Sequence, residues 1–118
     1  MSTVAIIGSR TFADYAKLSQ ALPALEAANQ FTIAKIVSGG ARGADSLAKK
    51  YAIERGIPIQ EFKPDWSLGK AAGIIRNTDI VNASNIVIAF WDGVSRGTLD
   101  SINKAKKTGK PVYIVEFK

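Results

Sequence analysis

The chain contains no cysteine and no histidine among its 118 residues. The lack of cysteine excludes disulfide bonds, thiol nucleophiles and thiolate metal sites. The lack of histidine removes the commonest general base and the commonest metal ligand. Any chemistry therefore depends on carboxylates, hydroxyls, amines, guanidinium groups or the backbone, and we expect neither a metal site nor a required cofactor.

Long apolar runs are also lacking. No stretch reaches the roughly 18 residues that a membrane-spanning helix needs, so we expect no membrane association. The N-terminus has no charged start followed by an apolar segment and a cleavage site. We therefore expect a cytoplasmic protein. A length of 118 residues with 47% hydrophobic content predicts one folded domain over residues 1–118.

Acidic residues are scarce relative to basic ones. The chain has 16 Lys and Arg against 10 Asp and Glu, a net charge of +6 and a pI near 9.7. A basic balance favours phosphorylated or polyanionic partners, although it also serves solubility alone.

Short apolar runs alternate with helical patterns along the whole chain. The runs cover residues 3–7, 33–37, 58–62, 86–90 and 112–117. Continuous apolar strands separated by helices predict an α/β fold in which a mainly parallel five-stranded sheet has helices on both faces. Right-handed crossovers then place every strand-to-helix turn at one edge, where ligands bind in such sheets.

Local signals give the expected helix boundaries. Asp14 and Ser67 are expected N-caps, and Pro23 is expected to kink or restart the first helix. Gly56 and Gly109, each followed two residues later by proline, indicate helix ends.

The turn Val37–Asp45 connects a strand to a helix and holds three glycines and one arginine. Glycines permit close approach of a ligand, and a helix start suits an anion, so a phosphate cradle is the first hypothesis. The turn matches neither the dinucleotide fingerprint nor the P-loop. A plain tight turn is the alternative, and Asp45 fits a helix cap or first-turn acid as well as a catalytic base.

Four of the five arginines lie in such turns or beside a glycine-lined helix: Arg10, Arg42, Arg76 and Arg96. Arginine forms bidentate bonds to phosphate, whereas lysine acts as a point charge. The placement predicts a composite anion site at one sheet edge. Solvated loop arginines are the alternative.

The helix after Ser67 carries an unusual pair of glycines. Its apolar stripe is expected at Ala71, Ile74, Ile75, Thr78 and Val81, with Gly69, Gly73, Arg76 and Asn77 on the opposite face. Each glycine costs about 1 kcal/mol relative to alanine. A ligand, a second subunit or tight packing on the sheet would offset that cost.

Tryptophans adjoin two of the turns. Trp66, with Gly69 and Gly73, is a candidate contact with a second subunit. Either Trp66 or Trp91 could stack on a base, or form the rim of the core.

Four blocks together resemble the YspA-like branch of the SLOG superfamily, over nearly the whole chain. The blocks are Gly8-Ser9-Arg10, Ser38 to Asp45, Gly73-x-x-Arg76-Asn77, and Phe90-Trp91-x-Gly93-x-Ser95-x-Gly97-Thr98. That superfamily is Rossmann-like, which implies three layers. It includes cytokinin-activating phosphoribohydrolases, the DNA-processing protein DprA/Smf and sensor domains for NAD-derived signals.

The resemblance implies a nucleotide-derived ligand over the turns at residues 8–10, 38–45 and 91–98. The expected ligand-binding residues are Gly8, Ser9, Arg10, Ser38, Gly39, Gly40, Ala41, Arg42, Gly43, Asp45, Arg76, Asn77, Trp91, Asp92, Gly93, Ser95, Arg96, Gly97 and Thr98. The expected function is binding of an ADP-ribose-type or cyclic nucleotide signal by a sensor or sequestering protein, as a homo-oligomer.

Two other functions remain open. The related hydrolases carry a glutamate where this chain has Ser101, and Asp100 lies one residue, or about 100° of helix, away. A nucleotide hydrolase would instead use Asp45, Asp92 or Asp100. Single-stranded nucleic acid is the third alternative, suggested by the lysines at 104, 106, 107 and 110.

Overall fold

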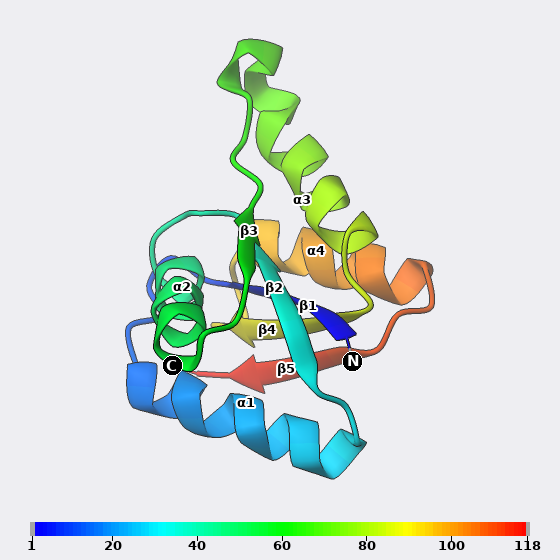
Figure 1. Cartoon of the computed structure of the whole chain (residues 1–118). Helices are drawn as coiled ribbons and strands as arrows, with labels where there is room; N and C mark the ends of the chain where they lie inside the picture. The colour runs from blue at the N-terminus through cyan, green and yellow to red at the C-terminus, as the bar shows by residue number, and fades with distance from the viewer. Residues whose placement is uncertain (1, 118) are drawn as a thin grey trace.

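The computed structural model of the chain describes residues 2–117. Five parallel strands form one sheet in the order β3-β2-β1-β4-β5, which confirms the predicted α/β fold (Figure 1). The strands are β1 (Ser2–Gly8), β2 (Ile33–Ser38), β3 (Ile59–Glu61), β4 (Ile86–Trp91) and β5 (Val112–Glu116). The helices are α1 (Tyr15–Asn29), α2 (Ala44–Arg55), the 3-10 helix η1 (Trp66–Ala71), α3 (Ala72–Asn82) and α4 (Arg96–Lys107).

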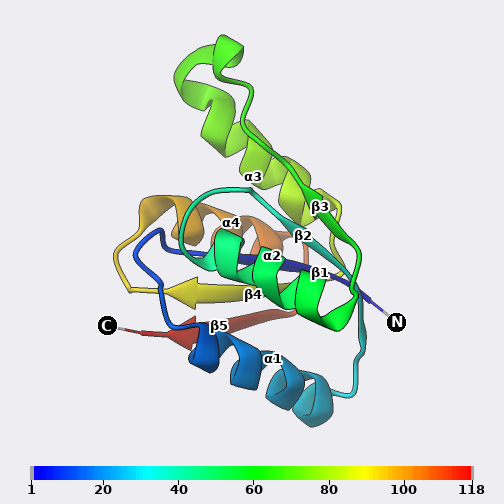
Figure 2. The ribbon, with the colours of Figure 1, turned by 60° about the vertical axis from the view of Figure 1, so that its left-hand side comes forward.

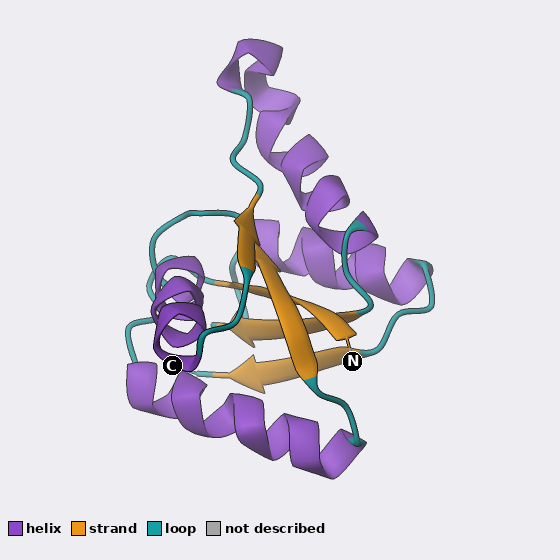
Figure 3. Ribbon diagram, in the orientation of Figure 1, coloured by secondary structure: helices purple, strands orange, loops and turns teal. Residues whose placement is uncertain are grey.

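The sheet separates two helical layers (Figure 3). Successive side chains of the central strand point to opposite faces, so that strand contributes to the core on both sides of the sheet. Val4 and Ile6 of β1 pack with buried residues of α1 and α2, including Leu18 and Tyr51. On the other face, apolar residues of β1 and β4 pack with residues of α3 and α4, such as Ile102. Three layers result, as expected. Within residues 2–117, no helix has the length and apolar character that crossing a membrane would require.

The start of α1 follows the sequence signal. Asp14 caps the helix as predicted, with its Oδ1 accepting a hydrogen bond from the backbone N–H of Lys17 at 3.0 Å. The expected restart at Pro23 is wrong, because α1 continues through it as one helix. Leu18 and Leu22, both fully buried, hold this stretch on the sheet despite the missing backbone donor.

The arm formed by η1 and the first half of α3 extends past the carboxyl edge of the sheet (Figures 1 and 2). Asp65 rather than Ser67 caps η1, accepting from the Ser67 N–H at 3.1 Å. The predicted apolar face of α3 is wrong in its first half, since Ile74 and Ile75 are 56% and 43% exposed. Only the second half of α3 lies over the sheet, so burial falls on the predicted Val81 together with Asn77 and Ile80.

Candidate functional site

A cavity of about 620 Å³ opens beyond the carboxyl ends of β1 and β4. These neighbouring strands mark the point where the strand order reverses, since β2 and β3 lie on one side of β1 while β4 and β5 lie on the other. Connections leaving the two strands run to opposite sides of the sheet, and the crevice between them is where open α/β sheets bind ligands.

The structure brings residues from all four predicted blocks to the cavity wall. Those lining it are Gly8, Ser9, Arg10, Ala41, Asp45, Arg76, Asn77, Asp92, Ser95, Arg96, Gly97, Thr98 and Asp100. Predicted residues that do not line it are Ser38, Gly39, Gly40, Arg42, Gly43, Trp91 and Gly93. The wall is completed by Ile7, Thr11, Trp66, Gly73, Ile74, Ile80 and Ser101.

Sequence reasoning missed the isoleucines of this wall for a physical reason. Ile7 and Ile80 carry no chemical signal and resemble core residues, and Ile74 has the spacing of a helix face that packs on the sheet. Trp66 and Gly73 did carry a signal, because the tryptophan could stack on a base and a ligand would offset the cost of the helical glycine.

The β4–α4 turn presents the start of α4 to the cavity. Asp92 Oδ1 accepts from the N–H groups of Val94 and Ser95 at 2.9 and 2.8 Å, and these bonds lower the pKa of Asp92. The N-cap residue Ser95 does not cap with its side chain; its Oγ lies 2.9 Å from Ser9 Oγ instead. The first turn of α4 therefore faces the cavity without a side-chain cap, which suits an anion.

Ser9 joins this turn to β1. Its side chain is 1% exposed, and its Oγ accepts from the Asp92 N–H at 3.2 Å. Its backbone N–H donates to the Phe90 carbonyl at 2.9 Å. The two strand ends that frame the cavity are thus fixed to each other through one buried serine.

The glycines of the β2–α2 turn are required by the chain's own packing. Gly43 has a φ of +76°, and a Cβ there would lie 2.6 Å from the Arg10 carbonyl oxygen. A Cβ on Gly39 would overlap Arg76 Nη1 and lie 2.9 Å from Asp45 Oδ2. Arg42 is exposed and outside the cavity wall. The turn thus reaches the cavity only through Ala41 and Asp45.

The buried Asp45 and the half-buried Arg76 lie behind this turn, where the opposite charge of each favours the ionised form of the other. Asp45 is 7% exposed and accepts from the Ala41 N–H at 3.1 Å, while Gly43 takes the N-cap position of α2. Burial raises the pKa of Asp45, and burial also lowers the pKa of Arg76. Arg76 Nη1 donates to the Gly39 carbonyl at 2.8 Å. Arg76 therefore stabilises the glycine turn as well as lining the cavity.

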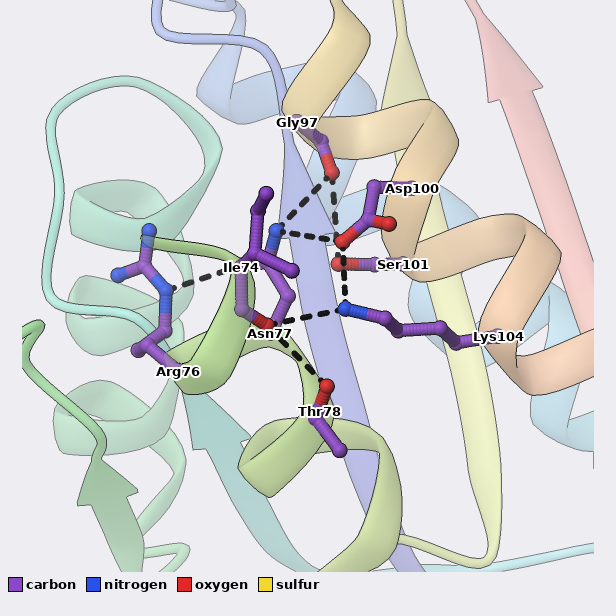
Figure 4. Close-up of polar contacts among 8 residues, drawn as sticks. All are labelled: Ile74, Arg76, Asn77, Thr78, Gly97, Asp100, Ser101 and Lys104. Carbon is purple, nitrogen blue, oxygen red and sulfur yellow. Dashed lines mark hydrogen bonds and ion pairs between the residues drawn. The ribbon is translucent and has the colours of Figure 1, made fainter. Parts of the chain in front are cut away.

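Asn77 links α3 to the first turn of α4 (Figure 4). Its Oδ1 accepts from Arg76 Nε at 3.1 Å, and its Nδ2 donates to Gly97 O and Asp100 Oδ2 at 3.3 and 3.2 Å. Lys104 Nζ donates to the same Asp100 oxygen at 2.8 Å. The carboxylate of Asp100 is thus neutralised by a lysine and held by an amide.

Gly97 differs from the glycines of the β2–α2 turn. It is the second residue of α4, it lines the cavity, and a Cβ built on it would meet no heavy atom within 4 Å. Its φ lies outside the left-handed region, so neither packing nor backbone geometry requires glycine here. The open space beside Gly97 lies where an anion at the helix start would make its closest approach.

The fold and cavity define a Rossmann-like domain with a cavity at its strand-order reversal. The chain belongs to the YspA, cpYpsA-related SLOG family, whose model matches residues 2–69. It is 34% identical to the Gene 61 protein of Mycobacterium phage D29 over 119 residues, covering 95% of this chain and 94% of that protein.

Solved structures show the same fold. The DNA processing protein A (DprA) of Streptococcus pneumoniae superposes with a TM-score of 0.76 at 21% identity, over 98% of this chain. This chain spans only 50% of that protein. The DprA of Helicobacter pylori, described for its single-stranded DNA binding mode, gives a TM-score of 0.68 at 26% identity, covering 98% of this chain and 66% of that one.

Proposed function

We propose that the cavity binds a nucleotide-derived small molecule, of the ADP-ribose or cyclic nucleotide type, with a phosphate at the start of α4. The observation that carries the proposal is the uncapped first turn of α4, flanked by Arg10 and Arg96 in a cavity whose opposite wall is apolar. Backbone N–H groups and guanidinium groups recognise phosphate, and the apolar wall suits the rest of a nucleotide. The protein would act as a sensor or by sequestering its ligand, in the cytoplasm and with no cofactor.

Two of the three carboxylates that line the cavity favour binding over catalysis. Asp92 is committed to two backbone N–H groups, and Asp100 to Lys104 and Asn77. Ser101 stands where the related hydrolases have glutamate, and it is 2% exposed. A general base needs a free carboxylate within reach of its substrate, and these three positions do not offer one.

Calorimetry against ADP-ribose, cyclic ADP-ribose isomers, NAD and nucleoside monophosphates tests the proposal. Removing the Arg96 side chain should weaken binding of the responding ligand by about 1.5–3 kcal/mol, because a charge-assisted hydrogen bond is lost. Arg42→Ala is the matched control, since Arg42 is exposed and outside the wall. No heat and no thermal stabilisation at millimolar ligand would reject the proposal.

Hydrolysis of a nucleotide is the second candidate, and Asp45 favours it. Asp45 lines the cavity, and its burial raises its pKa, which is the usual condition of a general acid or base near neutrality. Chromatography of nucleoside monophosphates after long incubation with concentrated protein decides this. Product that disappears with Asp45→Asn would support it; intact substrate would reject it for those compounds.

Single-stranded nucleic acid is a third candidate, favoured by the likeness to the Helicobacter pylori DprA. Two of the four lysines expected to bind nucleic acid already form hydrogen bonds within the chain. Lys104 bonds Asp100, and Lys110 Nζ bonds the Val81 carbonyl, which leaves Lys106 and Lys107 exposed. Binding to single-stranded DNA with a steep salt dependence would support this function, and no shift at low salt would dismiss it.

A second copy of the chain is the partner that we propose for the outer face of the arm. Leu68 and Ile75 are 54% and 43% exposed there, and neither lines the cavity. Exposed apolar surface of this kind marks contact surfaces. Sedimentation analysis of the wild-type chain and of Leu68→Glu should show a dimer or larger assembly that the charge disrupts; a monomer at high concentration would contradict this.

A further inference from the structure

The arm gives the cavity one apolar wall, made by Trp66, Gly73 and Ile74. Trp66 is 65% exposed and Ile74 is 56% exposed, and both border the cavity. The neighbouring cation, Arg76, bonds the Gly39 carbonyl through Nη1. The wall therefore offers a flat ligand surface of aromatic and aliphatic carbon.

Gly73 has no role in the fold that requires glycine. It is the second residue of α3, and its φ lies outside the left-handed region. A Cβ built on it would meet no heavy atom within 4 Å, whereas a Cβ on Gly39 would overlap Arg76. Glycine in a helix costs about 0.5–1 kcal/mol relative to alanine. The space beside Gly73 is therefore available to a group from outside the described residues.

We propose that this wall binds the planar base of the ligand, stacked on Trp66 and lying against the backbone of Gly73. The inference rests on the proposed function, which puts the phosphate of the same ligand at the start of α4. A planar ring needs a wall from which no Cβ protrudes, and tryptophan is the strongest stacking partner for a base. The two ends of one cavity then recognise the two ends of one nucleotide.

A second copy of the chain is the competing occupant of this wall. The exposed apolar residues of the arm divide into two sets, because Trp66 and Ile74 line the cavity while Leu68 and Ile75 do not. Only the cavity set is combined with the open space at Gly73 and with a nearby anion site. That combination favours a base on this wall and leaves the outer set to a protein partner.

Three probes separate the parts of the ligand: AMP, ribose 5-phosphate and adenosine. Affinities are measured by calorimetry for the wild-type chain, Gly73→Ala, Trp66→Ala, Trp66→Phe and the control Ile75→Ala. The two tryptophans also give two indole N–H signals by NMR, which Trp66→Phe assigns. We expect AMP to bind at least tenfold more weakly to Gly73→Ala and Trp66→Ala, with binding rescued by Trp66→Phe and unchanged in Ile75→Ala.

Ribose 5-phosphate should bind all of these variants equally, and adenosine at millimolar concentration should shift the Trp66 indole signal. Gly73→Ala should keep or exceed wild-type thermal stability, which excludes misfolding as the cause. Equal affinity of AMP for wild-type protein and Gly73→Ala would overturn the inference while leaving the phosphate site intact. Loss of self-association in Gly73→Ala, with AMP affinity unchanged, would assign the wall to a second copy. A Trp66 signal shifted by adenosine, with no binding of ribose 5-phosphate, would reject the phosphate site alone.

Discussion

Gly39→Ala and Gly97→Ala should change stability in opposite directions, although both glycines adopt backbone conformations that alanine accepts. A Cβ at residue 39 would overlap Arg76 Nη1 and lie 2.9 Å from Asp45 Oδ2. The guanidinium must then move, which breaks its 2.8 Å bond to the Gly39 carbonyl and weakens its electrostatic attraction for the buried Asp45 carboxylate. A Cβ at residue 97 would meet nothing.

The magnitude follows from the contacts that are lost. A hydrogen bond to a charged group contributes about 1.5–3 kcal/mol, so Gly39→Ala should cost about that amount. In a chain of this length, the melting temperature should fall by roughly 10 °C. Gly97→Ala should leave stability unchanged or raise it by up to about 1 kcal/mol through helix propensity.

Urea unfolding followed by circular dichroism measures both variants. The double variant Gly39→Ala with Arg76→Ala should be little less stable than Gly39→Ala alone, because the first substitution has already displaced the arginine. A free energy of unfolding for Gly39→Ala within 0.5 kcal/mol of wild type would refute the view that Arg76 holds this turn, whatever the double variant shows.

Three further substitutions probe other contacts. Burial raises the pKa of Asp45, which lies near Arg76 and Glu61. The free energy of unfolding of the wild-type chain should therefore fall as the pH rises from about 4 through the folded-state pKa of Asp45. Urea titrations at several pH values should show that this fall is missing in Asp45→Asn. Pro23→Ala should stabilise α1 by about 1–3 kcal/mol by restoring a backbone donor, and an unchanged unfolding midpoint would contradict this. Asn77→Ala should lower the free energy of unfolding by about 2 kcal/mol, because the hydrogen bonds that join α3 to the first turn of α4 are lost. The same loss should weaken phosphate binding. Urea unfolding measures the first effect and calorimetry the second.

The sheet was predictable from sequence because each strand is a short apolar run bounded by strong turn signals. The caps at Asp14 and Gly56 could be placed for the same local reason. The face of α3 could not. Its stripe of Ile74 and Ile75 has ordinary helical spacing, and only the tertiary arrangement shows that the first half of α3 extends past the sheet.

Pro23 illustrates the complementary error. Local chemistry argues for a break, but two leucines buried at one-turn spacing, Leu18 and Leu22, contribute more than one missing hydrogen bond costs. Intrinsic propensity is a weak signal wherever a helix has a large face to bury.

The candidate site separates glycines that the fold requires from glycines that it does not. The β2–α2 turn has the most glycines and looks most like a phosphate cradle, yet at Gly39 and Gly43 a side chain would collide with the chain itself. The sequence marks Gly73 and Gly97 as well, but only the structure distinguishes them from the glycines of that turn, because both start helices, both line the cavity and both face open space. A glycine that lowers helix stability, at a position where a side chain would meet no other atom, indicates that something else binds beside it. On that criterion the proposed ligand would lie between the first turns of α3 and α4, and the glycine-rich turn would support that site from behind through Arg76 and Asp45.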